Sequence, residues 1–387
     1  MTRLDRLWSV ADLRQAARAR LPRPIWDYLE GGAESEISIT RNGTAFDAYP
    51  LVPRTLTGLS RPDMSASFLG RSVSAPLMLS PTGMTRLFHA DKEIAVARAA
   101  ARAGLFYGLS TFATTSIEDA AVPDAPKLFQ LYMFRDRGLS EELLARCRAA
   151  GYHALCLTVD TTTSGNRLRD RRNGFTVPPR LRARSVLDFA MRPHWVSGLA
   201  RDRDFRLVNV GSRVPAGSTE AFLAYANREL DPAIGWNDVD WLRSLWDGPI
   251  LLKGVLAVED AIEASRHGVQ GLILSNHGGR QLDNTIAPVD AVGPIRQAVG
   301  GDLTLVVDGG IRRGGDIVRA LALGADACSI GRPYLYGLAA GGEAGVSRCI
   351  TLLLDELART MQLCGAATID DLRTRPPICF AGISPGA

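Results

Sequence analysis

Short runs of apolar residues recur along the chain, and each run ends at Gly, Ser, Thr, Asp or Pro. Most runs are followed by a stretch rich in Ala, Leu and Arg that has the character of a helix. Continuous apolar runs that alternate with amphipathic helices are typical of parallel strands covered on both faces. We therefore predict strands at residues 76–80, 105–110, 128–132, 154–160, 250–254, 271–275, 303–308 and 327–331.

Eight strand–helix units predict an α/β protein that folds as a (β/α)₈ barrel of the TIM type, and an open, doubly wound sheet is the alternative fold. We expect a single domain over residues 1–387, with the barrel at 71–337. The parts around the barrel are a helical N-terminal cap at 1–70 with helices at 11–20 and 24–30, an insertion at 161–249, and a closing helix at 344–361 within a C-terminal segment at 338–387. A barrel places such an insertion most usefully at its carboxyl face, above the active site.

The composition agrees with a large soluble protein. Hydrophobic residues make up 46% of the chain and charged residues 22%. With 45 basic and 41 acidic residues, the net charge of +4 predicts no nucleic-acid partner. The six cysteines lack a CxxC pair and zinc-type spacing, so we expect no metal site and a reducing compartment. Residues 1–20 lack the apolar core of a signal peptide, and no apolar run reaches membrane-spanning length, so we expect a cytoplasmic protein.

Candidate site residues stand at the carboxyl ends of the predicted strands, where barrels build their active sites. One polar strand end would carry little information, whereas a polar end on every strand predicts a site. In chain order these residues are Pro81, Thr82, Gly83, Ser110, Gln130, Tyr132, Thr158, Asp160, Lys253, Ser275, His277, Arg280, Asp308, Gly309, Gly310, Arg312, Gly331 and Arg332.

The seventh and eighth predicted strands end in glycine-rich turns that also carry arginines. Paired glycines such as Gly309 and Gly310 let backbone N–H groups approach an anion, and the helix that follows adds its dipole. Arg312, Gly331 and Arg332 complete two loops of the kind that holds a phosphate in many barrels. The alternative is that the glycines only make tight turns.

His277 and Arg280 are the strongest candidates for catalysis, because they follow the sixth strand at the expected mouth of the barrel. Arg280 could hold a carboxylate in a bidentate contact while His277 reaches the adjacent carbon. Asp160, at the end of the fourth strand, is the expected partner of the charged histidine, and helix capping is its alternative role. The remaining histidines are expected to be structural, namely His89, His153, His194 and His267.

Lys253 ends the fifth predicted strand among apolar residues. It could form a Schiff base with a carbonyl substrate, or it could place a fixed positive charge beside an electron-rich cofactor. Both interpretations fit a lysine at this place.

Three longer motifs surround these residues, and they read Ser-Asn-His-Gly-Gly-Arg-Gln-Leu-Asp at 275–283, Leu-Lys-Gly-Val at 252–255 and Asp-Gly-Gly-Ile-Arg-Arg-Gly at 308–314. Together they resemble the FMN-dependent 2-hydroxy-acid oxidase and dehydrogenase family, which includes glycolate oxidase, L-lactate dehydrogenase and mandelate dehydrogenase. The resemblance extends from residues 26–28 to 331–333. It implies FMN as the cofactor and oxidation of an L-2-hydroxy acid to the 2-oxo acid.

The resemblance also implies roles for individual residues. His277 would take up a proton, and Asp160 would stabilise its imidazolium. The substrate would be held by Arg280 and Tyr28 at its carboxylate, with Arg167 as a second cation, and by Tyr132 at its oxygen. Lys253 would lie at the N1/O2 edge of the flavin, which disfavours the Schiff base. The isoalloxazine would contact Pro81, Thr82, Gly83, Ser110, Gln130, Thr158 and Ser275, the ribityl chain Asp308, and the phosphate Gly309, Gly310, Arg312, Gly331 and Arg332.

Two positions bear on the acceptor and the substrate. Gly83 stands where many oxidases of the family carry Ala. A glycine there resembles the dehydrogenases, which pass electrons to quinone or another acceptor more readily than to oxygen. Phe112 stands where glycolate oxidases have Trp, which argues against a small substrate such as glycolate.

The insertion at residues 176–230 is similar to a segment that helps bacterial lactate and mandelate dehydrogenases attach to membranes. Its basic and apolar residues include Arg180, Arg182, Arg184, Leu187, Phe189, Met191, Arg192, Trp195, Leu199, Arg201 and Arg203. This mixture suits a helix on anionic lipid at the cytoplasmic face of the inner membrane, and a lid with a solvated basic face is the alternative. The family also implies a homotetramer.

Two other functions fit parts of the pattern. A Schiff-base aldolase or an FMN-binding isomerase would use the barrel and Lys253, but would leave His277, Arg280 and Asp160 unexplained. A non-catalytic barrel that has kept its flavin would usually have lost a catalytic side chain, and none is missing.

Overall fold

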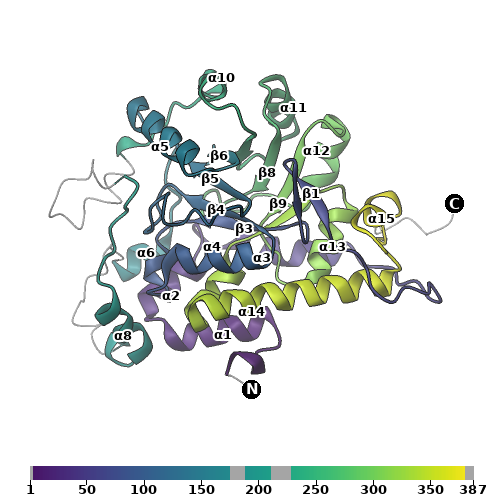
Figure 1. Cartoon of the computed structure of the whole chain (residues 1–387), viewed down its shortest axis with the longest axis horizontal. Coiled ribbons are helices and arrows are strands. Elements are labelled where there is room, and N and C mark those ends of the chain that lie inside the picture. The colour runs from purple at the N-terminus through teal and green to yellow at the C-terminus, as the bar shows by residue number, and fades with distance from the viewer. Residues whose placement is uncertain (1–2, 175–187, 211–227, 380–387) are drawn as a thin grey trace.

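A closed barrel of parallel strands forms the centre of the computed structural model, which describes residues 3–174, 188–210 and 228–379 (Figure 1). Its strands are β3 (Leu77–Thr82), β4 (Phe106–Ser110), β5 (Lys127–Leu131), β6 (Ala154–Thr158), β7 (Ile250–Lys253), β8 (Gly271–Ser275), β9 (Thr304–Asp308) and β10 (Ala327–Ile330). They pair in chain order, and β10 closes the ring against β3. The predicted TIM barrel is confirmed, although β6 ends at Thr158 and leaves Asp160 in the loop that follows.

A short hairpin closes the amino end of the barrel. It consists of β1 (Ala66–Phe68) and β2 (Arg71–Val73), which pair antiparallel. The Phe68 ring meets the Phe106 ring edge-on, with centroids 4.8 Å apart, and Phe106 is the first residue of β4. Because apolar side chains fill the barrel at this end, the carboxyl end is the one that can hold a site.

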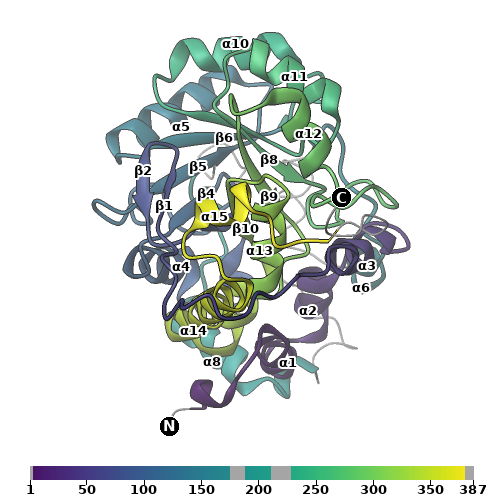
Figure 2. The ribbon, with the colours of Figure 1, turned by 90° about the vertical axis from the view of Figure 1, so that its right-hand side faces the viewer.

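Helices cover the outside of the barrel (Figure 2). They are α4 (Lys92–Arg102), α5 (Arg137–Ala149), α10 (Trp236–Leu245), α11 (Val258–Arg266), α12 (Val292–Val299), α13 (Gly314–Ala322), α14 (Arg332–Cys364) and α15 (Ile369–Thr374). The predicted closing helix at 344–361 lies within α14, which is kinked at Gly341 and Gly342. Gly342 has a φ of 59°, which favours glycine over other residues at this kink.

The N-terminal cap is helical, as predicted. It contains η1 (Leu4–Arg6), α1 (Val10–Arg20), α2 (Arg23–Glu30), α3 (Ile37–Thr44) and η2 (Ala45–Ala48). Helix α1 packs along α14 (Figures 1 and 2). The Asp283 carboxylate accepts the backbone N–H groups of Ser35 and Ser38 at 3.0 and 2.9 Å. The loop after β8 is therefore joined directly to the start of α3, so the cap lies against the site end of the barrel.

Within the insertion, the structure describes α6 (Leu168–Asn173) and α8 (Pro193–Arg201). Phe189 and Trp195, two of the apolar residues of the insertion, are buried, and their rings pack together with centroids 5.0 Å apart. Arg180, Arg182, Arg184 and Leu187 lie outside the described residues. Of the helices in the described ranges, none combines the length and the apolar character needed to cross a membrane.

Candidate active site

A cavity opens at the carboxyl ends of the barrel strands and has about 1500 Å³ of free space, part of it open to solvent. Most of the predicted site residues line it. These lining residues are Tyr28, Pro81, Thr82, Gly83, Ser110, Tyr132, Arg167, Lys253, His277, Arg280, Asp308, Gly309, Gly310, Arg312, Gly331 and Arg332. The structure thus brings together side chains from the cap, the insertion and the barrel.

His277 and Asp160 form a pair at this cavity. The His277 Nδ1 atom lies 3.2 and 3.3 Å from the two carboxylate oxygens of Asp160. The Ser275 hydroxyl accepts the backbone N–H of His277 at 3.0 Å, and Gln281 Nε2 donates to the Asp160 carbonyl at 2.8 Å. Burial raises the pKa of Asp160, but His277 and Lys253 outweigh it, so the net pKa lies below its ordinary value. An ionised Asp160 on Nδ1 leaves Nε2 of His277 as the nitrogen able to take up a proton.

Two arginines lie against Tyr28. The guanidinium of Arg280 stands 4.8 Å from the Tyr28 ring centre and that of Arg167 stands 5.6 Å from it. Arg280 is held from behind, because its Nη1 donates to the carbonyls of Tyr28 at 2.6 Å and Gly31 at 3.0 Å. Burial, with Arg167 as the next cause, lowers the pKa of Arg280 to about 10, so it stays charged at neutral pH. Two neighbouring cations at a partly enclosed cavity favour an anionic ligand such as a carboxylate.

Lys253 is paired with a buried carboxylate. Its Nζ lies 2.9 Å from Asp308 Oδ2 and donates to the Ser275 hydroxyl at 3.1 Å. Burial alone would lower the pKa of Lys253, but Asp308 above all raises it beyond its ordinary value. Asp308 also accepts the hydroxyl of Ser80 at 2.7 Å. Lys253 is therefore a fixed positive charge in the cavity wall.

The barrel contains buried polar groups that suit a planar heteroaromatic cofactor. Strand register places Gln130 beside Ser110 and Thr158 beside Lys253, level with the cavity. The Gln130 Nε2 and Thr158 Oγ1 atoms are buried and have no hydrogen-bond partner among the described residues. Unsatisfied buried groups of this kind are costly and rare, and the ring edge of an isoalloxazine offers them partners. The residues present therefore fit FMN.

A second part of the cavity suits a phosphate. Gly309 and Gly310 have φ angles of 136° and 83°, and a Cβ atom on Gly310 would lie 1.8 Å from the Asn42 carbonyl oxygen. The neighbouring strand β10 is followed directly by Gly331, the N-cap of the long helix α14. Arg312 lines the same region. A glycine turn, a helix N-terminus and an arginine are features typical of phosphate-binding loops, so the phosphate site here stays a prediction.

Arg332 is engaged differently from the prediction. Its guanidinium donates to backbone carbonyls of the cap and of the histidine loop, namely Leu29 at 3.0 Å, Glu30 at 3.4 Å, Gly31 at 3.0 Å and Gly278 at 2.8 Å. Arg332 therefore joins the end of α2 to the loop that carries His277. Its contact with a phosphate stays a prediction.

Of the apolar wall of the cavity, sequence reasoning identified only Phe112. Met84, Phe88 and Leu230 line it, and Phe112 stacks on Tyr132 with ring centroids 4.9 Å apart. Phe88 and Met84 follow β3 in a short 3₁₀ turn, and Leu230 lies in the insertion. Apolar residues in loops carry no chemical signal of their own, so only the three-dimensional arrangement identifies them.

The chain is similar to proteins of one family along almost its whole length. The family model described as FMN-dependent dehydrogenase matches residues 17–376. An L-lactate oxidase from Nostoc sp. is 41% identical over 97% of this chain and 99% of its own length. An L-lactate dehydrogenase from Serratia proteamaculans is 39% identical over 93% and 96%. A solved structure of the monotopic membrane protein (S)-mandelate dehydrogenase matches with a TM-score of 0.92 and 38% identity, over 97% of this chain and 100% of that chain.

Proposed function

Because the chain belongs to the family of FMN-dependent 2-hydroxy-acid dehydrogenases and oxidases, we propose that it oxidises an L-2-hydroxy acid with His277 as the base. FMN is the cofactor of this family, and oxidation of a 2-hydroxy acid is its reaction. The observation that carries the proposal is the meeting of a carboxylate-paired histidine and a pair of arginines in one cavity.

The two arginines beside Tyr28 would orient the substrate. We expect Arg280 to bind the substrate carboxylate, with Arg167 and the Tyr28 side chain beside it. A carboxylate held at two points fixes the rotation of the neighbouring carbon, so only one enantiomer presents its hydrogen to the cofactor. That restriction supports a preference for one enantiomer, and the relatives that act on L-lactate support the L form.

His277 would take up a proton, and Tyr132 would donate a hydrogen bond to the substrate. Oxidation releases two protons and two electrons from the substrate, and His277 Nε2 would accept one of these protons. The adjacent Asp160 carboxylate stabilises the resulting imidazolium. Burial raises the pKa of Tyr132, with the Asp160 charge as the next cause, so its hydroxyl stays protonated and can donate to the substrate oxygen.

FMN, when bound, supplies the electron acceptor for this oxidation. Ser110, Gln130, Thr158 and Ser275, with the turn at residues 81–83, would hold the ring, and Asp308 the ribityl chain. Gly309, Gly310, Arg312, Gly331 and Arg332 would hold the phosphate. Lys253 would place its charge beside the ring, where it favours the anionic reduced form.

We propose that electrons leave to quinone or a similar acceptor rather than to oxygen. Gly83 carries this proposal, because a Cβ atom there would lie 3.0 Å from the Phe112 carbonyl oxygen and 3.1 Å from its Cβ. An alanine at this position would fit only with a small shift of Phe112. The glycine therefore leaves more room beside the ring than the alanine of many oxidases does.

Anaerobic mixing with a panel of L- and D-2-hydroxy acids tests the proposed function. We expect the flavin absorbance near roughly 450 nm to bleach with an L-acid and to remain with its D-enantiomer. Admission of air should then restore the colour slowly, as for a dehydrogenase. A flavin that no 2-hydroxy acid reduces would contradict the proposed reaction, and rapid recovery in air would contradict the acceptor.

Peripheral membrane contact through residues 176–230 and assembly into a homotetramer are separate proposals. The first is supported by similarity to the monotopic (S)-mandelate dehydrogenase and by the exposed Met191 and Val196. Vesicle sedimentation with anionic and neutral lipids tests that contact, and light scattering tests the assembly.

A further inference from the structure

We propose that residues 188–210 of the insertion position one wall of the substrate pocket, through Arg86 and Trp195, and thereby select which substrate side chains are accepted. The inference rests on the proposed oxidation, because it assigns the size selectivity of the same site. The residues concerned lie outside the groups that bind carboxylate or move protons. They would act as positioning residues.

The wall consists of residues 84–88, which include the 3₁₀ turn η3 (Thr85–Leu87). Its two ends, Met84 and Phe88, line the cavity. The Phe88 ring stacks on Tyr28, with centroids 6.3 Å apart and planes 18° from parallel. Because Tyr28 is a proposed substrate contact, the position of Phe88 bears directly on the space beside the substrate.

Arg86 points away from the cavity and into the insertion. Its side chain is 1% exposed, although it carries a full charge. The Nη2 group donates to the carbonyls of Gly198, at 3.0 Å, and Asp202. The guanidinium also lies over the Phe205 ring, 4.5 Å from its centre. A buried charge needs such partners. The position of the turn that carries Arg86 therefore depends on the position of Gly198, Asp202 and Phe205.

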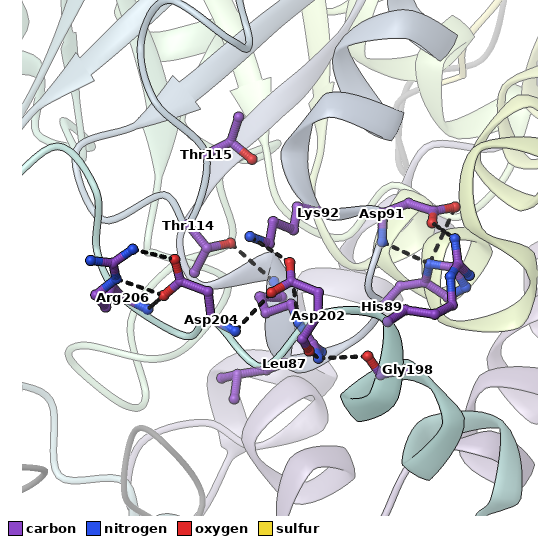
Figure 3. Close-up of polar contacts among 12 residues, drawn as sticks. Leu87, His89, Asp91, Lys92, Thr114, Thr115, Gly198, Asp202, Asp204 and Arg206 are labelled. Atoms are coloured by element: carbon purple, nitrogen blue, oxygen red, sulfur yellow. Dashed lines mark hydrogen bonds and ion pairs between the residues drawn. The ribbon is translucent and has the colours of Figure 1, made fainter.

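Two further contacts hold the same wall. Trp195 Nε1 donates to the backbone carbonyl of Leu87 at 2.8 Å. The Asp202 carboxylate lies 2.6 Å from Lys92 Nζ and 3.8 Å from Arg86 Nε. Figure 3 shows Lys92 and Asp202 pointing toward each other, with Gly198 nearby. Asp202 thus bridges the turn and the start of α4.

The barrel holds the wall from the other side. Thr114 Oγ1 accepts the N–H of Arg86 at 3.2 Å, and the buried Glu93 carboxylate accepts the N–H of Thr85 at 3.2 Å. The wall is therefore held between the barrel and the insertion, while Met84 and Phe88 at its two ends line the cavity. A shift of the insertion face is transmitted to Met84 and Phe88, since packed side chains transmit small displacements.

Two variants of the holoenzyme test the inference, with a third as a matched control. Trp195→Phe removes the donor to Leu87 and keeps an aromatic ring, and Asp202→Asn removes the charge between Lys92 and Arg86. Arg201→Gln is the control, because Arg201 lies in α8 like Trp195. It removes the 3.1 Å ion pair to Asp91, which lies outside the wall at the start of α4. The readouts are kcat and KM for L-mandelate and L-lactate. Calorimetric dissociation constants for phenylacetate and propionate, which lack the hydroxyl group, provide a readout that needs no turnover.

We expect the ratio of kcat/KM for L-mandelate to that for L-lactate to change at least about fivefold in both wall variants, mainly through KM. The affinity ratio of the two analogues should change in the same direction, while the FMN content of both wall variants stays at the wild-type level. Arg201→Gln should keep the wild-type value of both ratios. Unchanged ratios in folded, yellow variants overturn the inference, as does an equal change in the control. Failure of Trp195→Phe to fold also overturns it, because the contact would then only stabilise the protein. A wild type that no 2-hydroxy acid reduces refutes the proposed reaction, whereas the analogue affinities still decide the role of the wall.

Discussion

Asp160 places both of its carboxylate oxygens within 3.3 Å of Nδ1 of His277. The two residues are 117 positions apart in the chain and are joined by the closure of the barrel. A carboxylate at Nδ1 fixes the orientation of the ring. His267 has a similar contact, since its Nδ1 lies 2.7 Å from Asp240 Oδ1, so what distinguishes His277 is that it also lines the cavity.

Replacement of the base is the most direct test of this pair. His277→Gln should slow anaerobic flavin reduction by about 10²- to 10⁴-fold, because a glutamine cannot take up the proton. FMN content should remain at the wild-type level. His267→Gln is the matched control, since His267 pairs with Asp240 and Glu263 and does not line the cavity. Stopped-flow bleaching measures both, and near-normal reduction in His277→Gln would remove this residue from the mechanism.

The lowered pKa of Asp160 predicts how its contribution to stability depends on pH. A carboxyl group whose pKa falls on folding stabilises the protein above its ordinary value of 3.8, and loses that effect as the pH falls through the lower value. The difference in unfolding free energy between wild type and Asp160→Asn should thus shrink as the pH falls below about 4. Urea titrations measure it. Asp370→Asn is the control, because the Asp370 side chain is 83% exposed. Its difference in unfolding free energy from the wild type should not shrink below pH 4.

Strand ends could be predicted from the sequence because their signal is local and repeated. An apolar run followed by Asp160, Lys253 or His277 indicates a strand that ends in a polar group, and barrel closure then brings such ends together. Gly309 and Gly310 were predictable for a similar reason, since a turn with positive φ angles favours glycine.

Contacts made by tertiary packing could not be predicted in this way. The composition of the insertion suggested a lipid-facing surface, but Trp195 is buried because its indole N–H bonds to the Leu87 carbonyl. Phe88 carries no signal of a site until Tyr28 is placed beside it. The sequence likewise gives no sign that the Arg332 guanidinium donates to the backbone carbonyls of Leu29 and Gly31, which lie about 300 residues earlier.

Lys253 should not act as a nucleophile. Its pKa is raised by Asp308, so the neutral amine needed for a Schiff base is scarce near neutral pH. We expect no covalent adduct on Lys253 after incubation with a 2-oxo acid and borohydride, as judged by peptide mass spectrometry. Lys127 is a useful control because it is similarly buried, and burial lowers its pKa. Formaldehyde and borane should methylate Lys127 before Lys253 at pH 8, and the reverse order would contradict the assignment of a fixed charge.

Arg280→Lys should weaken substrate binding even though the charge is kept. One ammonium cannot donate to the carbonyls of Tyr28 and Gly31 and also hold a carboxylate at two points. Loss of charge-assisted hydrogen bonds predicts a KM higher by about 10- to 100-fold. Arg266→Lys, at a side chain 70% exposed, should leave KM unchanged. Steady-state kinetics with the best L-acid decide the matter, and equal KM values would place the carboxylate elsewhere.

The phosphate loop can be tested at a single glycine. A Cβ atom on Gly310 would lie 1.8 Å from the Asn42 carbonyl oxygen, and the backbone there has a φ of 83°, so Gly310→Ala must displace the loop or α3. We expect a cost of at least about 1 kcal/mol in unfolding free energy and weaker FMN binding. Gly43→Ala, in helix α3 with open space around it, should instead stabilise the protein by about 0.5–1 kcal/mol and leave the cofactor bound. Fluorescence titration with FMN at low temperature, where both variants are folded, separates the two effects. A Gly310→Ala protein with wild-type FMN affinity would show that the phosphate does not depend on this turn.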